Sequence, residues 1–174
     1  CGRYISERHS VEEGGITTGI EIEAGAAVEL GTELSDAQIA TIRAADTFFI
    51  GTSHPDGPAD ASHRGGNPGF VIVDSPQTLR WPDYNGNAMF MTLGNITLNP
   101  RVGLLFPDWA TGGLLQVSGR AHVDWATTAA AQLPGAERVV KFTVDAVQQT
   151  PRALSTRWSP SILSRYNPRM VLVA

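Results

Sequence analysis

Two short polar stretches of this chain carry residue types that bind phosphate groups. The first is Ser62-His63-Arg64, followed directly by Gly65-Gly66. The guanidinium of Arg64 is a planar fork that matches phosphate oxygens, and the glycines let a ligand approach the backbone closely. The alternative is a surface arginine beside a flexible loop. We interpret His63 as a structural histidine rather than a catalytic one.

The second stretch, Asp83 to Asn87, is a polar turn directly before a helical pattern. Asn87 is a favourable N-cap residue, and Gly86 permits backbone conformations that other residues avoid. The unpaired amides and the positive dipole end of a helix start attract anions. The alternative is a turn and a cap with no ligand. The helix is predicted from the apolar residues Met89, Leu93 and Ile96 and from the stop at Asn99-Pro100.

Short strands surround these two stretches. Turn signals recur about every 8–12 residues without a regular βαβ alternation, which predicts an antiparallel barrel or sandwich. We expect strands at 47–52, 59–62, 69–73, 78–81, 102–106, 114–122 and 138–147, and a looser edge strand or extended arm at 16–23.

Two local signals are especially clear. Ser35 and Gln38 form a capping-box pattern, which predicts a short helix over 36–45, and Leu34 with Ile39 would supply the matching hydrophobic staple. In the last strand, apolar residues at 140, 142, 144 and 146 alternate with polar ones, which predicts one buried face.

Composition narrows the class of protein. The chain has 174 residues and a net charge of −4, which disfavours a general nucleic-acid or anionic-membrane surface. No apolar run approaches the roughly 20 residues of a membrane span. The single cysteine, Cys1, excludes an intramolecular disulfide and fits a reducing compartment, so we expect a cytoplasmic protein. Because the chain starts at Cys1, it is either a fragment of a longer protein, which we favour, or a processed lipoprotein.

Three blocks of sequence resemble the pyridoxamine 5′-phosphate oxidase-like family of FMN-binding split β-barrels. They are "ADTFFIGTSHPDGPADASHRGGNPGFVIV", "LRWPDYNGNAMFMTLGNITLNPRVGLLF" and "LLQVSGRAHV", within residues 44–125. The resemblance implies a mainly β fold, a six-stranded antiparallel Greek-key split barrel with a few flanking helices. It also implies a homodimer with FMN at the subunit interface and a small-molecule substrate. We expect an N-terminal arm at 1–33 and the FMN-binding domain at 34–174.

The resemblance implies cofactor contacts from four places. The strand end at 62–65 would contact the phosphate and ribityl chain, and the strand at 81–84 would pass beside the flavin ring. The turn at 85–87 would meet the phosphate, and Gln116 would reach the flavin, in one arrangement from the partner subunit. Trp81 has a structural alternative as a barrel core residue. The implied residues are Ser62, His63, Arg64, Gly65, Trp81, Asp83, Tyr84, Asn85, Gly86, Asn87 and Gln116.

One departure from the family concerns the phosphate. Pyridoxamine phosphate oxidases carry a Ser-Arg-Lys run just before the corresponding helix, where this chain has Asn85-Gly86-Asn87. The lost charges predict weaker FMN binding, or a different flavin-like ligand, with phosphate contacts from Arg64 and backbone amides. Pyridoxamine phosphate is not expected as the substrate.

Three functions are compatible with the resemblance. The first is an FMN-dependent oxidoreductase, in which the flavin carries the chemistry and the protein binds and orients it. The second is a deazaflavin-dependent reductase, and the third is a non-catalytic flavin-binding or dimerisation module. The sequence shows no metal-ligand cluster and no Ser-His-Asp or paired-carboxylate arrangement, so no catalytic residue is assigned.

Overall fold

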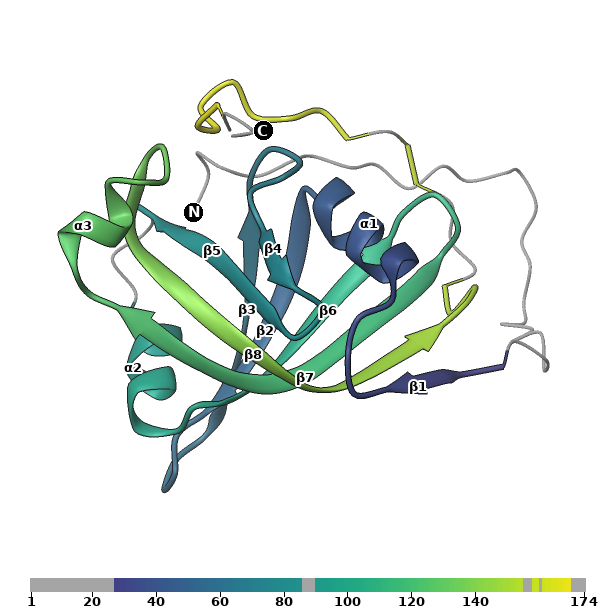
Figure 1. The fold of residues 1–174 in the computed structure, drawn as a ribbon, viewed down its shortest axis with the longest axis horizontal. Helices are drawn as coiled ribbons and strands as arrows, with labels where there is room; N and C mark the ends of the chain where they lie inside the picture. The colour runs from purple at the N-terminus through teal and green to yellow at the C-terminus, as the bar shows by residue number, and fades with distance from the viewer. Residues whose placement is uncertain (1–26, 86–89, 155–157, 160, 170–174) are drawn as a thin grey trace.

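The computed structural model describes residues 27–85, 90–154, 158–159 and 161–169. Within these residues eight strands form one antiparallel sheet with three helices around it (Figure 1). The edge strand expected at 16–23 lies outside the described residues. The elements are β1 (Glu29–Gly31), α1 (Asp36–Ala44), β2 (Thr47–Ser53), β3 (Ala59–Gly65), β4 (Ile72–Ser75), β5 (Thr78–Tyr84), α2 (Met91–Leu98), β6 (Arg101–Asp108), β7 (Gly113–Asp124), α3 (Thr127–Ala130) and β8 (Ala136–Thr150).

The sheet curls around one core without closing. Its strand order is β3-β2-β6-β7-β8-β5-β4, and β1 pairs with β8 away from this path. The path ends at β3 and β4, which do not pair with each other in the described part of the chain. The predicted mainly β split-barrel class is therefore confirmed. Six of the strands have seven or more residues, and β1 and β4 are short additions.

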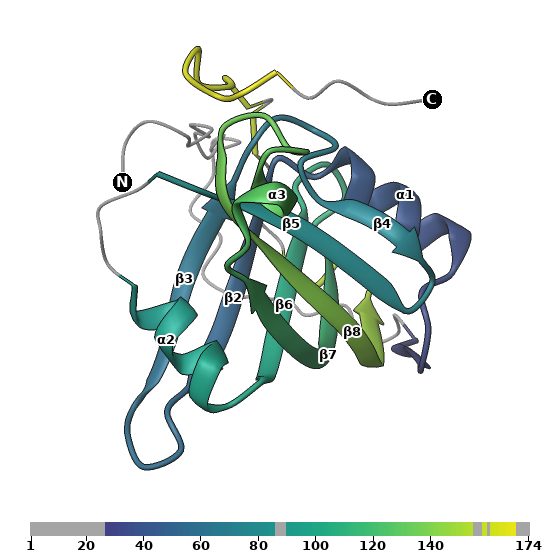
Figure 2. The same cartoon turned by 60° about the vertical axis from the view of Figure 1, so that its left-hand side comes forward.

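The long strands follow the alternation of the sequence. Residues 113–124 of β7 alternate between buried and exposed side chains over most of their length. β8 pairs with β1, β5 and β7, so its 15 residues join both halves of the sheet. Figure 2 shows β2, β3 and β6 behind the diagonal strands β8, β5 and β4.

Aromatic side chains fill the centre of the barrel. Phe48 is fully buried, and its ring centroid lies 5.2 Å from that of Trp81, 5.2 Å from that of Phe106 and 5.8 Å from that of Phe70. Trp81 also contacts Phe142, with centroids 6.2 Å apart. Because the rings meet at angles that range from stacked to edge-on, they interlock in the way that stabilises an aromatic core.

The capping box of α1 is confirmed. The Gln38 amide donates to the Ser35 hydroxyl oxygen at 3.4 Å, and the Ser35 amide donates to the Gln38 side-chain oxygen at 3.0 Å. Leu34 belongs to the buried core, and Ile39 packs against that core. The helix packs on β4 and β6, whereas α2 packs on β2, β3 and β7 (Figure 1).

One predicted strand begins later than expected. The strand predicted at 69–73 starts at Ile72 because Gly69 has a φ of 88°, a left-handed conformation that suits glycine in a turn. The Phe70 amide donates to the Asn67 carbonyl at 2.9 Å and closes that turn. β3 and β5, in contrast, extend three residues further than predicted, so Arg64 and Asp83 lie within strands.

Candidate functional site

The pairing of β2 with β3 separates the Ser62-His63-Arg64 run into two faces. Arg64 lies opposite Phe48 and Ser62 opposite Ile50, both core residues, so Ser62 and Arg64 are on the inner face. His63 lies opposite Phe49 on the outer face. Adjacent strand residues point to opposite sides, so these three side chains cannot all contact one ligand group.

A hydroxyl network attaches α2 to β3. The Thr92 hydroxyl donates to the Asp60 carboxylate at 2.9 Å, and the Ser62 and Thr92 hydroxyls are 2.9 Å apart. Since the Thr92 proton is engaged with Asp60, Ser62 must donate to Thr92. Ser62 therefore offers acceptor lone pairs in this arrangement, and the donors for an anion must come from elsewhere.

Helix α2 begins at Met91, with Phe90 as the N-cap residue, and Phe90 supplies no side-chain hydrogen bond to the helix. The expectation that Asn87 is the N-cap is therefore wrong, because the helix starts further along the chain. Gly86 and Asn87 themselves lie outside the described residues. The first intrahelical bond runs from the Gly94 amide to the Phe90 carbonyl at 2.8 Å. The earlier first-turn amides have no i−4 carbonyl within the described helix, and amides at a helix start are the kind of donor that suits an anion.

Arg64 is half-buried on the inner face. Its guanidinium donates to the neighbouring His63 carbonyl at 3.1 Å and forms no ion pair with any described residue. Burial lowers the pKa of Arg64, while the carboxylates of Asp83 and Asp60 oppose that shift. The side chain remains cationic in spite of this lowering. Most of its hydrogen-bond donors therefore have no partner among the described residues.

Asp83 is paired with an arginine that sequence reasoning missed. The Arg138 guanidinium donates to the Asp83 carboxylate at 2.9 Å, and the exposed fractions of the two side chains are 20% and 14%. Burial raises the pKa of Asp83, although the hydrogen bond from Arg138 and the charge of Arg64 act in the opposite direction. Arg138 also contacts Glu137 at 3.1 Å.

Two exposed aromatic rings flank Arg138. Its Cζ lies 4.9 Å from the centroid of Phe90 and 5.4 Å from that of Trp125. Arg138 has the same parity as the inward-facing Val140 and Phe142 of β8. An arginine that continues the buried side of a predicted strand is unusual, and this signal could have identified Arg138 from the sequence.

The remaining residues predicted on β5 and the turn have different environments. Tyr84 is half-buried and lies opposite Ala136 of β8, and the Asn85 side chain donates to Glu137 at 2.7 Å. The Trp81 side chain is 1% exposed and lies in the aromatic core. This position favours the structural alternative for Trp81, since a side chain enclosed by the barrel has no face left for a flavin ring.

His63 and Gln116 share the outer face of the barrel. The cross-strand pairs His63–Phe49, Phe49–Leu105 and Leu105–Gln116 form one row across four strands. His63 contacts the Thr47 hydroxyl at 3.3 Å, and burial, followed by the charge of Arg64, lowers its pKa. Gln116 is exposed. Gly65 ends β3 opposite Thr47, two residues after His63 and on the same face of the strand.

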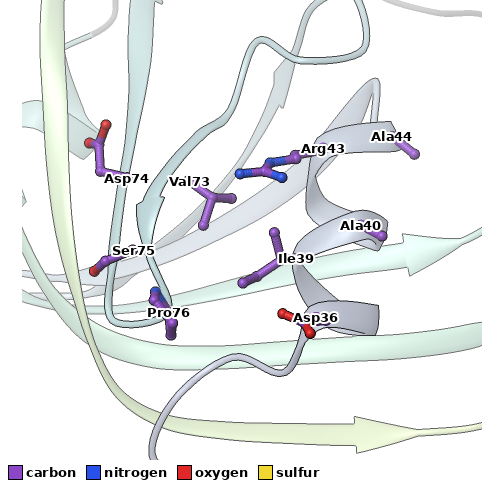
Figure 3. Close-up of a pocket in the computed structure, with 9 residues that line it drawn as sticks. All are labelled: Asp36, Ile39, Ala40, Arg43, Ala44, Val73, Asp74, Ser75 and Pro76. Carbon is purple, nitrogen blue, oxygen red and sulfur yellow. The ribbon is translucent and has the colours of Figure 1, made fainter. Parts of the chain in front are cut away.

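A cavity of about 780 Å³ lies elsewhere, between α1 and the β4–β5 turn (Figure 3). The Arg43 side chain points across it toward Val73, and Asp74 on its far wall is paired with Arg80 at 3.0 Å. None of its lining residues belongs to the predicted set.

In the described ranges there is no group of three metal-ligating side chains. The helices described there are too short or too polar to cross a bilayer.

Comparisons with known proteins identify the fold. The family model described as "Pyridoxamine 5'-phosphate oxidase" matches residues 34–157. A variant of HupZ from Group A Streptococcus is similar in structure, with a TM-score of 0.54 at 12% identity, over 67% of this chain and 98% of that one. The "putative pyridoxamine 5′-phosphate oxidase" of Lactobacillus delbrueckii has a TM-score of 0.55 at 19% identity, over 67% and 94%. No curated protein matches the chain.

Proposed function

The chain belongs to the pyridoxamine 5′-phosphate oxidase family, and on this premise we propose that it binds FMN and acts as an oxidoreductase on a small molecule. The observation that carries the proposal is Arg64, a half-buried arginine whose only hydrogen bond to a described residue goes to the His63 carbonyl, while the carboxylates of Asp60 and Asp83 are engaged by Thr92 and Arg138. A charged donor kept without an ion pair costs stability, and an anionic ligand is what recovers it.

The residues present fit a flavin phosphate. Arg64 would donate to its oxygens, and the first-turn amides of α2 would add backbone donors. Gly65, Asp83 and Tyr84 would line the same end of the barrel, with Asn85, Gly86 and Asn87 in the connection that leads to α2. We propose His63 and Gln116 as contacts on the outer face.

FMN, when bound, would supply the electron transfer. The protein would anchor the phosphate through Arg64 and orient the flavin at the open edge of the barrel. No proton-transferring side chain is assigned. The core behind the site, closed by Phe48 and Trp81, keeps water away from that side.

Purification of the protein tests this function. We expect a yellow preparation with flavin absorption bands, and mass spectrometry of the released cofactor should give the mass of FMN. If the released cofactor has the mass of a deazaflavin, the protein uses that class of cofactor and the assignment of FMN is wrong. A colourless protein that does not take up added FMN would favour the non-catalytic module and contradict the proposal.

We propose in addition a homodimer that uses the outer face. Phe49 is 38% exposed on this face, and Gly51 and Gly103 lie side by side next to it, where the missing side chains allow close approach of another surface. Gln116 occupies the same face and could reach a flavin held by the partner. A stable dimer would bury more than about 1,000 Å² in total.

The substitution Phe49→Asp is expected to convert the dimer to a monomer at micromolar concentration, because it places a charge in the apolar part of the interface. Light scattering coupled to size-exclusion chromatography measures the mass. Leu98→Asp is the matched control, since Leu98 is exposed at the end of α2, on a different element. A wild-type monomer that binds FMN tightly would contradict the dimer.

A further inference from the structure

Arg64 stands near two carboxylates and is paired with neither. Arg64 lies opposite Phe48, whose ring centroid is 5.2 Å from that of Trp81, and Asp83 follows Trp81 by two residues on the same face of β5. Asp60 lies on the same face of β3 as Arg64, and both carboxylates counter the lowering of the Arg64 pKa by burial. The Asp60 carboxylate accepts a hydrogen bond from the Thr92 hydroxyl at 2.9 Å, and the Asp83 carboxylate accepts one from the Arg138 guanidinium at 2.9 Å. Each neighbouring carboxylate therefore already has a donor from another element of the fold.

Arg138 is held on Asp83 from several directions. Its guanidinium lies against the rings of Phe90 and Trp125 and contacts Glu137 at 3.1 Å. Stacking on two aromatic faces fixes the plane of a guanidinium and limits its alternative positions. Arg138 is therefore the better-anchored of the two arginines near Asp83.

We propose that Arg138 is a positioning residue that keeps Asp83 occupied, so that Arg64 stays available to the phosphate of an anionic ligand. This inference rests on the proposed function. Asp83 is 14% exposed, and a carboxylate at that depth does not remain unpaired. The charge of Arg64 also acts on Asp83, and we expect that without Arg138 the Arg64 side chain would turn to Asp83 and be lost to the ligand.

The test compares FMN with riboflavin, which lacks the phosphate. Arg138→Met is expected to weaken FMN by about tenfold and riboflavin by less than about threefold, because the competition affects only the phosphate contact. Arg138→Lys keeps the charge beside Asp83 and should retain most of the FMN affinity. Arg120→Met is the matched control, since Arg120 forms an exposed 3.5 Å ion pair with Asp145.

A second pair of variants separates positioning from direct contact. Asp83→Asn removes the negative charge at position 83. Arg64 then has no carboxylate there to pair with, whether or not Arg138 is present. Asp83→Asn and Asp83→Asn/Arg138→Met should therefore bind FMN equally. If Arg138→Met alone does not fold, this pair still tests the inference, since the double variant leaves no buried carboxylate without a cation; Glu137, which also loses Arg138, is exposed.

A measurement without ligand keeps this inference distinct from the proposed function. Phenylglyoxal labels accessible arginines, and peptide mass spectrometry gives the labelling rate of Arg64. We expect Arg138→Met to slow that labelling by about threefold, because Arg64 then pairs with Asp83. If the wild type binds neither FMN nor riboflavin, the proposed function is wrong, and the labelling rate still decides the role of Arg138.

Three results would overturn the inference. Arg138→Met could weaken both flavins equally, which would indicate a structural role. The double variant could bind FMN more weakly than Asp83→Asn alone, which would indicate that Arg138 contacts the phosphate itself. Arg64 could be labelled at the wild-type rate in Arg138→Met, which would show that the two arginines do not compete for Asp83.

Discussion

Replacing Arg64 by alanine is expected to weaken FMN binding by about 10- to 100-fold, the equivalent of one hydrogen-bonded charge. Riboflavin affinity should change little, because the lost partner of Arg64 is the phosphate. The difference between the two ligands should shrink at high salt, although only in part, since Arg64 is half-buried and therefore incompletely screened.

The same substitution should leave the free energy of unfolding nearly unchanged. Arg64 forms no ion pair with the described residues, so its removal breaks only the hydrogen bond to the His63 carbonyl. Arg43→Ala is the matched control, an exposed arginine on α1 that lines the separate cavity. Titrations of both flavins at two salt concentrations decide the matter. Equal weakening of FMN and riboflavin would place the phosphate elsewhere.

The elements with short-range signals were predictable from the sequence. The capping box depends on Ser35 and Gln38, three residues apart, and its hydrogen bonds have the predicted pattern. The alternation in β8 depends on next-but-one neighbours, and Val140, Phe142 and Val144 are buried as predicted. Ala146 is exposed, contrary to the prediction, because the pairing with β7 shifts register between Ser118 and Gly119 and Val147 takes the buried position. Both signals require no knowledge of the rest of the fold, which is why they sufficed.

The start of α2 depends on contacts that the local sequence does not reveal. Asn87 has the stronger intrinsic capping preference, yet the helix begins at Met91. The helix is fixed from outside by Thr92 on Asp60, by Asn95 on Thr52 at 3.1 Å and by Asn99 on Ser53 at 3.0 Å. Tertiary hydrogen bonds of this kind outweigh a cap worth about 1 kcal/mol.

The division of the candidate residues between the inner and outer faces of the barrel could partly have been predicted from the sequence. Extending the predicted strand by three residues and applying its two-residue period would have separated His63 from Ser62 and Arg64. The partner of Asp83 was not accessible, because Arg138 is 55 residues away and reaches it only through the pairing of β5 with β8. The two-residue period of the strand places Arg138 on the buried face, where an arginine is unusual, but it does not show which residue Arg138 pairs with.

Trp81→Ala is expected to lower the free energy of unfolding by about 3–5 kcal/mol, the range for removing a buried aromatic side chain. Trp81 is 1% exposed, and its ring lies 5.2 Å from Phe48 and 6.2 Å from Phe142, so truncation leaves a cavity between rigid rings. Urea unfolding gives the value. Trp125→Ala, at a tryptophan that is 56% exposed, should cost much less.

The flavin spectrum of the same variant decides between the two roles considered for Trp81. Aromatic side chains that touch the isoalloxazine quench its emission, and a core residue does not touch it. We therefore expect the emission per bound flavin to be unchanged in Trp81→Ala under conditions where the variant is still folded. A rise in that emission would show that Trp81 contacts the ring, and the burial of its side chain would then have to be relieved when the flavin binds.

The effect of Trp81→Ala on affinity should differ in kind from that of Arg64→Ala. Since Trp81 packs against Phe48 and Phe48 lies opposite Arg64, the stability loss should reach the inner face, and FMN and riboflavin should weaken together. That common weakening is the opposite of the phosphate-selective loss expected for Arg64→Ala, so the two variants distinguish support of the site from contact with its ligand.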